Sequence, residues 1–355
     1  MIGLQTIAVA FAMFSALPVP QFAWNQKNMR YAMCAFPLIG VVIGGLWCLC
    51  GALPLPMPAK AAGFCLIPVW VTGGIHLDGY ADTCDALSSY GDREKKLEIL
   101  KDPHCGAFAV IRLCSYFAAY LALCACVDFT PRVGLCWTLA LVLERALSGL
   151  AVASFPMAKN TGLAHTFATA ADRTTVRRVL MALAALLSAA LLALGGWALV
   201  LAALLVFARY HVVSNKQFGG ITGDLAGWFL QKSRAVDAGG AVCLPVGRTV
   251  MIFITGPLYS GKRTFAQRLP GTRIAEVQAL AAEAEDLEKL AEELSAYDIV
   301  MATEVGGGVV PMDAGERAAR EAAGRLACLL AARAGCVVQM FCGIPTVLKG
   351  ELPPC

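Results

Sequence analysis

Hydrophobic residues dominate long stretches of the chain, and polar residues lie mostly between them. Seven apolar segments can be distinguished in the first 208 residues. Each is near the roughly 20 residues that an α-helix needs to cross a bilayer, although the third and the last two are short. Backbone polar groups in hydrocarbon must be satisfied within the segment, so the pattern predicts helices. The approximate limits are 3–19, 33–55, 61–75, 106–127, 134–153, 179–194 and 196–208.

The number of membrane crossings depends on one dipeptide. Gly195-Gly196 separates the last two apolar segments and is either a tight turn between two spans or a kink in one long span. The pattern therefore predicts a polytopic α-helical membrane protein with six or seven spans. The N-terminal segment lacks the basic start of a signal peptide, so we interpret it as the first span and not as a cleaved leader.

The composition agrees with a membrane protein. Hydrophobic residues make up 58% of the chain and charged residues 15%, whereas a soluble domain is about 25% charged. The net charge of +4 is too small to indicate nucleic-acid binding. The fifteen cysteines are scattered without a CxxC pair of metal spacing, and we interpret them as small apolar packing residues.

Basic residues indicate the orientation in the membrane, because they gather in alternate loops. One side of the membrane has only Lys60 and Arg132. By the positive-inside rule the other side is cytoplasmic. We therefore expect a multi-pass protein of the cytoplasmic (inner) membrane, with residues 76–105 in the cytoplasm. If Gly195-Gly196 is a turn, the C-terminal region is expected in the cytoplasm as well. The cytoplasmic basic residues are Lys27, Arg30, Arg93, Lys95, Lys96, Lys101, Lys159, Arg173, Arg177, Arg178, Arg209 and Lys216.

The pattern changes after residue 235. Residues 1–235 form the predicted membrane domain, 236–249 a linker, and 250–355 a second domain. In this last domain "TVMIFITG", "YDIVMAT" and "CVVQMFCG" predict strands. "AEVQALAAEAEDLEKLAEELSA" and "GERAAREAAGRLACLLAARAG" have helical spacing. Alternation of strands and helices predicts a small α/β domain with a parallel sheet.

Three aspartates stand at the edge of the third apolar segment, in "GGIHLDGYADTCDAL". The spacing of Asp78, Asp82 and Asp85 places them on one face of a helix. Their mutual repulsion favours a divalent cation, and oxygen ligands favour Mg²⁺, Mn²⁺ or Ca²⁺ over zinc. Mg²⁺ with a few carboxylates and a phosphate is the usual arrangement for phosphoryl transfer. Two interpretations remain: a metal–phosphate site, or a solvated interfacial loop whose carboxylates only hydrate and cap helices.

Further polar residues follow the aspartates. His76 would orient a carboxylate or touch a phosphate, or it is an ordinary interfacial residue. Lys101 would counter phosphate charge, and Asp102 would add a ligand. We interpret Arg93 and its basic neighbours as ordinary cytoplasmic positive charge.

A second polar cluster, "FGGITGDLAG", follows the last apolar segment. Its glycines, among them Gly220 and Gly223, allow close approach of the backbone to a ligand, and Asp224 is a further candidate ligand. Arg112 and Arg145 lie within apolar segments, where a charge indicates either a functional site or a side chain that reaches the interface.

These stretches, with "FPLIGVVIGG" and "GDREKKLEILKDPHCGAFAV", resemble the cobalamin-5′-phosphate synthase (adenosylcobinamide-GDP ribazoletransferase) family over roughly residues 1–235. The resemblance implies an integral membrane transferase of the last part of cobalamin biosynthesis. It would join adenosylcobinamide-GDP to α-ribazole or α-ribazole 5′-phosphate, release GMP and require Mg²⁺. One departure is Gln231, near a place where the family tends to carry a glutamate.

The resemblance implies roles for the quoted motifs. Asp78, Asp82 and Asp85 would be catalytic metal ligands, with His76 and Lys101 as further catalytic residues. Two alternatives differ in class: another membrane Mg²⁺-dependent phosphotransferase, and a transporter with a nucleotide-binding tail. The chain lacks the D-x2-D-G-x2-A-R arrangement of the CDP-alcohol enzymes, and the tail lacks a transporter ATPase's signature motif and length. The expected substrate-binding residues are Asp102, Gly220, Gly223 and Asp224.

The tail begins with "GPLYSGKR", which nearly fits the phosphate-binding loop G-x4-G-K-[ST]. Gly256, Gly261 and Lys262 would cradle phosphates. The position after Lys262 is arginine, so the nearest hydroxyl is displaced to Thr264. Glu304 and the glycines after it either line a nucleotide site or form a structural turn.

The tail resembles the bifunctional adenosylcobinamide kinase/guanylyltransferase family at its start, "MIFITGPLYSGKRTFA", and at its end, from Thr303 to Pro345. The middle of that family is largely missing, together with the histidine that it guanylylates, since the last histidine here is His211. We expect a degenerate domain that does not make adenosylcobinamide-GDP. Its expected roles are to bind GTP or ATP, to hold another cobalamin-assembly enzyme, or to help the membrane domain fold.

Overall fold

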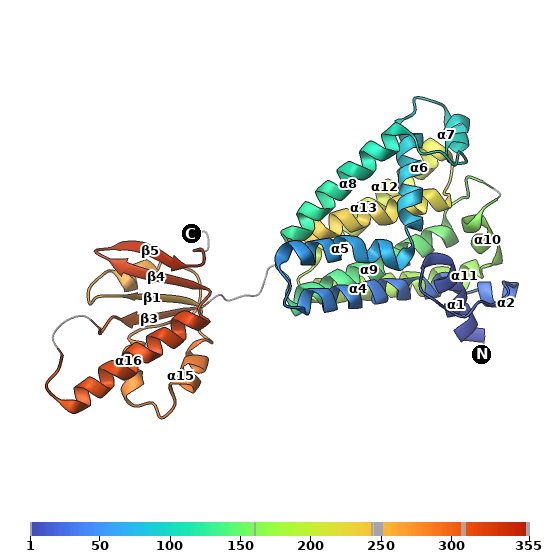
Figure 1. The fold of residues 1–355 in the computed structure, drawn as a ribbon. Helices are drawn as coiled ribbons and strands as arrows, with labels where there is room; N and C mark the ends of the chain where they lie inside the picture. The colour runs from blue at the N-terminus through green and yellow to red at the C-terminus, as the bar shows by residue number, and fades with distance from the viewer. Residues whose placement is uncertain (1, 160, 243, 245–250, 307–309, 353–355) are drawn as a thin grey trace. The chain divides into compact units, whose positions relative to one another are not determined.

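The structure is a computed structural model that describes residues 2–159, 161–242, 244, 251–306 and 310–352. Contacts divide the chain into two units, residues 1–246 and 247–355. The first unit is a bundle of helices and the second a small sheet with helices (Figure 1). The helices of the first unit are α1 Ile2–Phe14, α2 Gln26–Met29, α3 Ala32–Ala35, α4 Pro37–Ala52, α5 Met57–Thr72, α6 Ile75–Ser88, α7 Arg93–Ile99, α8 Ala107–Ala125, α9 Pro131–Ser154, α10 Leu163–Ala170, α11 Arg173–Ala193, α12 Trp197–Val213, the π-helical turn Ser214–Phe218 and α13 Gly223–Val242.

The bundle contains enough long apolar helices to confirm a polytopic membrane protein. Among the described residues, five helices are long and apolar enough to cross a bilayer. The pair α5 and α6 makes a sixth candidate if the two count as one bent span. Helix α9 is the central element, since most of its residues are buried and it packs against α4, α11 and α13. The five are Ala32–Ala52, Ala107–Ala125, Pro131–Ser154, Arg173–Ala193 and Trp197–Phe218.

The N-terminal helix is shorter than predicted. Helix α1 has 13 residues, so it is about 20 Å long at 1.5 Å per residue. A bilayer core is about 30 Å thick. The helix ends at Phe14, before Pro18 and Pro20, which cannot continue it. The prediction of a first span over residues 3–19 is therefore wrong in length.

The glycine pair at 195–196 forms a turn. Helix α11 ends at Ala193 and α12 begins at Trp197, and each is a separate candidate span. Gly195 has φ +74°, in the left-handed region that favours glycine. Of the two alternatives that the sequence left open, the structure has the tight turn.

The third apolar segment is broken by a second glycine pair. Helix α5 ends at Thr72 and α6 begins at Ile75, with an angle of 96° between them. Gly73 and Gly74 join the two helices with φ +62° and +82°, which other residues adopt only with strain. The aspartates that follow therefore lie on a helix, α6, which turns back to pack against α13.

Helix α13 extends into the predicted linker. It continues to Val242, and Asp237, Ala238 and Ala241 are buried in it. Residues 236–242 are thus helical because they pack in the bundle, and that part of the linker prediction is wrong. Leu244 is also buried. The other linker positions, 243 and 245–249, lie outside the described residues.

Two glycines allow α6 and α13 to approach closely (Figure 1). A Cβ added at Gly79 would stand 2.7 Å from the Cα of Asp224. A Cβ added at Gly227 would stand 2.8 Å from the carbonyl oxygen of His76. Both distances are shorter than real Cβ contacts, so each helix needs glycine where it meets the other. This contact brings the aspartate motif of α6 against the second polar cluster.

The second unit is a five-stranded sheet in the order β2-β3-β1-β4-β5. The predicted strands form β1 (Ile252–Gly256), β3 (Ile299–Thr303) and β4 (Cys336–Phe341), all parallel. The sequence missed the short β2 (Arg273–Ile274) and the antiparallel β5 (Ile344–Lys349). The sheet is therefore mixed, because β4 turns directly into β5 through Cys342 and Gly343, which both have positive φ.

Two helical segments were expected in this unit. The second is present as α16 (Ala314–Arg333). The first is broken into a 3-10 helix, Val277–Ala282, and α15, Leu287–Leu294. The break occurs because Asp286 caps α15, its side chain accepting hydrogen bonds from the amides of the first turn. The expectation of one helix over residues 275–296 is therefore wrong.

We expect Gly79→Ala to lower the free energy of unfolding of the helical unit by about 1–3 kcal/mol, since overpacking forces backbone shifts. Gly239→Ala is the matched control, because it lies in α13 and an added Cβ there would meet nothing within 4 Å. This control should be neutral or stabilising by up to about 1 kcal/mol. Thermal unfolding in detergent measures both, and equal melting temperatures for the two variants would contradict the proposed packing constraint.

Candidate active site

A cavity of about 520 Å³ lies in the helical unit beside the start of α6 and the start of α13. It gathers polar groups from segments far apart in the sequence. Five of the predicted site residues line it: His76, Asp78, Lys101, Gly223 and Asp224. The other polar side chains in its wall are Ser148, Lys159, Thr161, His165 and Thr222.

The three aspartates of α6 have different surroundings. Asp78 lines the cavity and is exposed. Asp82 does not line it, but lies close enough for its charge to interact with those of Asp78, Asp85, Asp224 and Lys159. The carboxylate of Asp85 lies against Gly106, the N-cap residue of α8. A carboxylate is favourable at a helix N-terminus, so Asp85 supports the start of α8 and is separate from the cavity.

The donor set fits Mg²⁺ only together with a phosphate. Among the residues that the structure describes, no three His, Cys, Asp or Glu side chains are grouped to hold a metal ion. The expected set of Asp78, Asp82 and Asp85 is therefore not a ready-made three-carboxylate site, because Asp85 lies at α8. Mg²⁺ usually takes one or two carboxylates plus waters and substrate phosphates. The hard oxygens of Asp78 and Asp82 are suited to that arrangement.

Lys159 lines the cavity, although the sequence indicated it only as a cytoplasmic basic residue. It follows a segment bound to the second polar cluster: Ile221 donates its amide to Pro156, and Ala158 donates to Ile221, at 2.8 and 3.0 Å. Position 220 needs glycine, because a Cβ at Gly220 would lie 2.6 Å from the backbone of the same segment. Burial lowers the pKa of the Lys159 ammonium, and the Asp224 carboxylate opposes that shift. No motif around Lys159 could have indicated this position.

Asp224 is the carboxylate on the α13 side of the cavity. The Thr222 hydroxyl donates a hydrogen bond to it at 3.2 Å and accepts one from the Leu225 amide. Burial raises the pKa of Asp224, while Lys159 and the Thr222 hydroxyl act in the opposite direction. A half-buried carboxylate with a raised pKa, next to a lysine, is suited to exchange a proton.

His76 is buried at the bend between α5 and α6. Its ring lies 6.0 Å from that of Phe36 in an edge-on arrangement. Its Nδ1 has no hydrogen-bond partner in the described part of the chain. A buried polar atom without a protein partner is available to a ligand or a water.

Two other predicted residues lie outside the cavity. Asp102 is exposed and accepts hydrogen bonds from the amide and ring of His104, at 2.9 and 2.7 Å. These bonds lower the pKa of Asp102. The adjacent Lys101 lines the cavity. The turn formed by Asp102 and His104 therefore positions Lys101, and Asp102 itself adds no ligand to the cavity. Gly220 does not line the cavity and acts through the backbone contact described above.

A group of buried charges lies behind His76, and the sequence indicated only Arg145. Glu144 and Arg145 form an ion pair of 2.7 Å with no solvent exposure. Arg234 and Asp237 of α13 are also buried, and the charges of Arg145 and Arg234 act on His76. The linker predicted over residues 236–249 does not indicate Asp237, which is buried in α13.

Hydrogen bonds connect this group to α8. The Gln231 side-chain oxygen accepts from the Tyr116 hydroxyl at 2.7 Å and from Arg234 Nη1 at 3.1 Å. The Asp237 carboxylate has no hydrogen-bond partner among the described residues, but lies within reach of the charges of Arg234 and Arg145. Two cations and two carboxylates thus share one buried region between α9 and α13.

The predicted nucleotide-binding residues of the second unit lie around one loop. Gly256 ends β1, and Gly261 precedes the five-residue α14, Lys262–Ala266, which contains Thr264. Lys262 Nζ donates to the carbonyls of Gly256 and Pro257 at 2.9 and 2.7 Å. The amide of Glu304 donates to Gly256 at 3.0 Å. The structure therefore brings Lys262 and Glu304 to the same loop. The Lys262 ammonium donates its hydrogen bonds to the backbone carbonyls of this loop.

Family models match parts of both units. The family model "Cobalamin-5-phosphate synthase" matches residues 6–241. The model "Cobinamide kinase / cobinamide phosphate guanyltransferase" matches residues 271–348, after the glycine-rich loop.

Relatives named adenosylcobinamide-GDP ribazoletransferase are similar to the helical unit. The protein of Lachnoclostridium phytofermentans is 43% identical over 263 residues, which cover 71% of this chain and 98% of the relative. That of Clostridium perfringens strain 13 is 31% identical over 237 residues, covering 64% of this chain and 92% of the relative. That of Geobacillus kaustophilus is 31% identical over 252 residues, covering 64% and 91%.

We expect Arg234→Leu to destabilise the helical unit by about 3–5 kcal/mol, because it leaves buried carboxylates with a single cation. The double variant Arg234→Leu/Asp237→Leu removes one charge of each sign and should be more stable than Arg234→Leu alone. Thermal unfolding of Arg234→Leu, Asp237→Leu and the double variant in detergent tests this charge balance. A double variant destabilised by the sum of the two single changes would show that the charges are independent.

Proposed function

The chain belongs to the cobalamin-5-phosphate synthase family, and from this membership we propose that the cavity beside α6 and α13 is its active site. The chain is a transferase of cobalamin biosynthesis. In the proposed reaction it joins adenosylcobinamide-GDP to α-ribazole or α-ribazole 5′-phosphate and releases GMP. The observation that carries the assignment is the convergence of Asp78, Asp224, Lys101 and Lys159 on one cavity. This combination suits a pyrophosphate substrate and a hydroxyl nucleophile.

The reaction exchanges one P–O bond for another. A ribazole hydroxyl oxygen attacks the phosphorus attached to the cobinamide arm, and the bond from that phosphorus to GMP breaks. The hydroxyl must lose a proton, and we assign its acceptance to Asp224. Burial raises the pKa of Asp224, which makes it a better base than an ordinary carboxylate as long as it remains ionised.

Lysines would stabilise the negative charge that moves onto GMP. Lys159 and Lys101 both line the cavity, and their charges are close enough to interact. Ammonium groups held by the fold can stabilise a leaving phosphate without reorganisation. The pairing of Ile221 with Pro156 and Ala158 holds Lys159 at this position.

Mg²⁺ is part of the proposal. Asp78 and Asp82 would hold it together with substrate phosphates, since one or two carboxylates are a usual protein contribution. When bound, the ion supplies positive charge that neutralises the pyrophosphate. Asp85 is not included, because its carboxylate lies against Gly106 at the start of α8.

Aromatic side chains in the cavity wall would bind the flat base of α-ribazole. The ring centroid of Phe14 lies 4.7 Å from that of Phe36 and 5.4 Å from that of Phe167. All three line the cavity. Adenosylcobinamide is a much larger molecule than this cavity, so only its phosphate end would enter.

We propose that the cavity opens to the cytoplasm. Basic residues favour the cytoplasmic side for the segment 76–105 and for the segment around Lys159. Because α1 is too short to cross and α5 with α6 makes one bent span, six crossings would leave the segment before α3 and the segment after α12 on the same side. The substrates are charged phosphates, which agrees with an aqueous, cytoplasmic entrance.

We propose that the second unit lacks guanylyltransferase activity. The chain has no histidine after His211, and the family that this unit resembles is guanylylated on a histidine. Lys262 remains beside the loop and Glu304, so binding of GTP or ATP stays part of the proposal.

We expect Asp82→Ala to abolish GMP release and Lys159→Gln to lower its rate about 100-fold, the usual cost of losing one stabilising group for developing charge. The assay supplies adenosylcobinamide-GDP, α-ribazole 5′-phosphate and Mg²⁺ to membranes containing the protein. Asp128→Ala and Lys216→Gln are matched controls, because both residues are exposed and neither lines the cavity. Full activity of Asp82→Ala would refute the metal assignment, and full activity of Lys159→Gln the role of the lysine.

The full-length chain incubated with labelled GTP should form no covalent GMP adduct. An active adenosylcobinamide kinase/guanylyltransferase serves as the positive control, and protein denatured with detergent at alkaline pH, where a histidine–GMP bond survives, is examined for retained label. Retained label would show that the second unit uses another nucleophile and would overturn its assignment as degenerate.

A further inference from the structure

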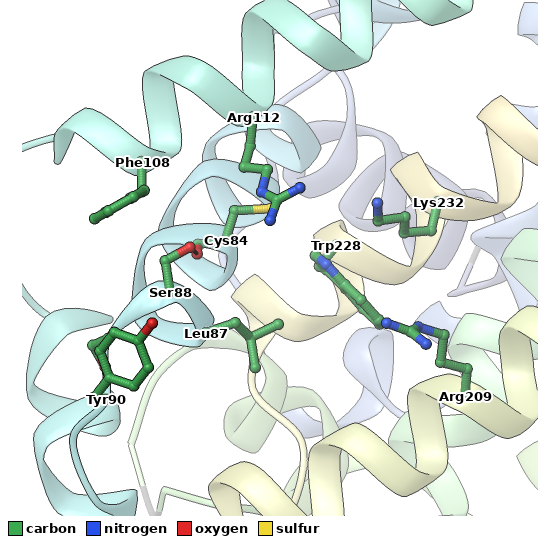
Figure 2. Close-up of a pocket in the computed structure, with 10 residues that line it drawn as sticks. Cys84, Leu87, Ser88, Tyr90, Phe108, Arg112, Arg209, Trp228 and Lys232 are labelled. Carbon is green, nitrogen blue, oxygen red and sulfur yellow. Dashed lines mark hydrogen bonds between the residues drawn. The ribbon is translucent and has the colours of Figure 1, made fainter.

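A second pocket, of about 460 Å³, lies near the C-terminal end of α6 and shares no lining residue with the proposed active site (Figure 2). Its wall comes from four helices and the residues that follow α6. Figure 2 shows the side chains of Arg112 and Arg209 extending from α8 and α12 toward Trp228 of α13. The lining residues are Cys84, Leu87, Ser88, Ser89, Tyr90, Phe108, Arg112, Arg209, Trp228 and Lys232.

Three cations and no carboxylate line this pocket. Arg112, Arg209 and Lys232 come from three different helices, and within the described residues none of them forms an ion pair. The charges of both arginines act on Lys232, whose ammonium lies 5.5 Å from the ring centroid of Tyr80. Like charges held together repel each other, so a bound anion would stabilise this arrangement.

The pocket lies at the end of apolar helix surfaces. Arg112 is in the second turn of α8 and Arg209 in the last turns of α12, and both are exposed. Large apolar side chains around them, among them Phe108, Ile111 and Leu205, are exposed as well. In helices that span a membrane, such surfaces contact lipid tails, and arginines at their ends lie at the level of phosphate headgroups.

We propose that this pocket binds a phosphate-bearing anion at the membrane boundary through Arg112, Arg209 and Lys232. Guanidinium groups match phosphate oxygens with paired N–H donors, and the lysine adds a compact charge. The phosphate belongs either to an anionic phospholipid, whose tails would follow Phe108 and Ile111, or to a water-soluble phosphate. The recognition chemistry is the same for both.

The experiment measures binding to the full-length protein, purified in detergent and stripped of lipid. One arm adds phosphatidylglycerol, with phosphatidylcholine for comparison, and counts bound lipid by native mass spectrometry. The other arm titrates inorganic pyrophosphate into the protein and its variants by calorimetry. The binding that the arginine variant loses relative to the unmodified protein is assigned to this pocket. Arg112→Gln/Arg209→Gln should weaken binding at least tenfold in one arm or both. Arg177→Gln/Arg178→Gln is the matched control, since these arginines are exposed at the start of α11 and line neither pocket.

The arms distinguish the source of the phosphate. A loss confined to phosphatidylglycerol identifies a lipid headgroup, and a loss confined to pyrophosphate identifies a soluble ligand. Arg112→Lys/Arg209→Lys keeps the charge and should retain most of the binding, and Lys232→Gln provides an independent test if the glutamine pair does not fold. Unchanged binding in both arms for the variants that lose charge, or an equal loss in the α11 control, would overturn the proposal.

Discussion

The close contact between α6 and α13 is the constraint on which the rest of the helical unit depends. Gly79 meets the backbone at Asp224, and Gly227 meets the backbone at His76, at distances that leave no room for a Cβ. Each glycine is adjacent in sequence to a polar side chain or close to one, so the contact that packs the helices also brings those side chains together. Packing and chemistry are coupled here, because any side chain that separated the helices would also open the cavity.

The buried charges behind the cavity extend this coupling into the bundle. Ionised groups in a helical interior cost free energy unless they are paired. Here Glu144 and Arg145 are paired directly, and Arg234 is hydrogen-bonded to Gln231, which also binds Tyr116. These contacts join α8, α9 and α13 behind His76. A polar interior of this kind restricts how the helices can slide past one another, which hydrophobic packing alone does less well.

Helix α6 lines two cavities whose charged residues differ. Its first turn contributes Asp78 to a cavity that is lined by both carboxylates and lysines. Its last turns contribute Leu87 and Ser88 to a pocket whose charged lining residues are all cations. A cavity of mixed charge suits proton transfer and phosphate chemistry together, whereas a cationic pocket suits binding only.

The sequence alone determined the class of each unit and indicated which polar motifs are the candidates for chemistry. Apolar runs of bilayer length predict helices, alternating strands and helices predict an α/β domain, and aspartates at helical spacing predict a polar face, because all of these depend on neighbours along the chain. Tertiary structure decided that Asp78 lines the cavity while Asp85 supports α8, that Lys159 joins the site, and that Asp237 is buried and not part of a linker. These outcomes depend on contacts between segments far apart in sequence. Spacing along one helix specifies which side chains share a face, but only the opposing helix determines what that face meets.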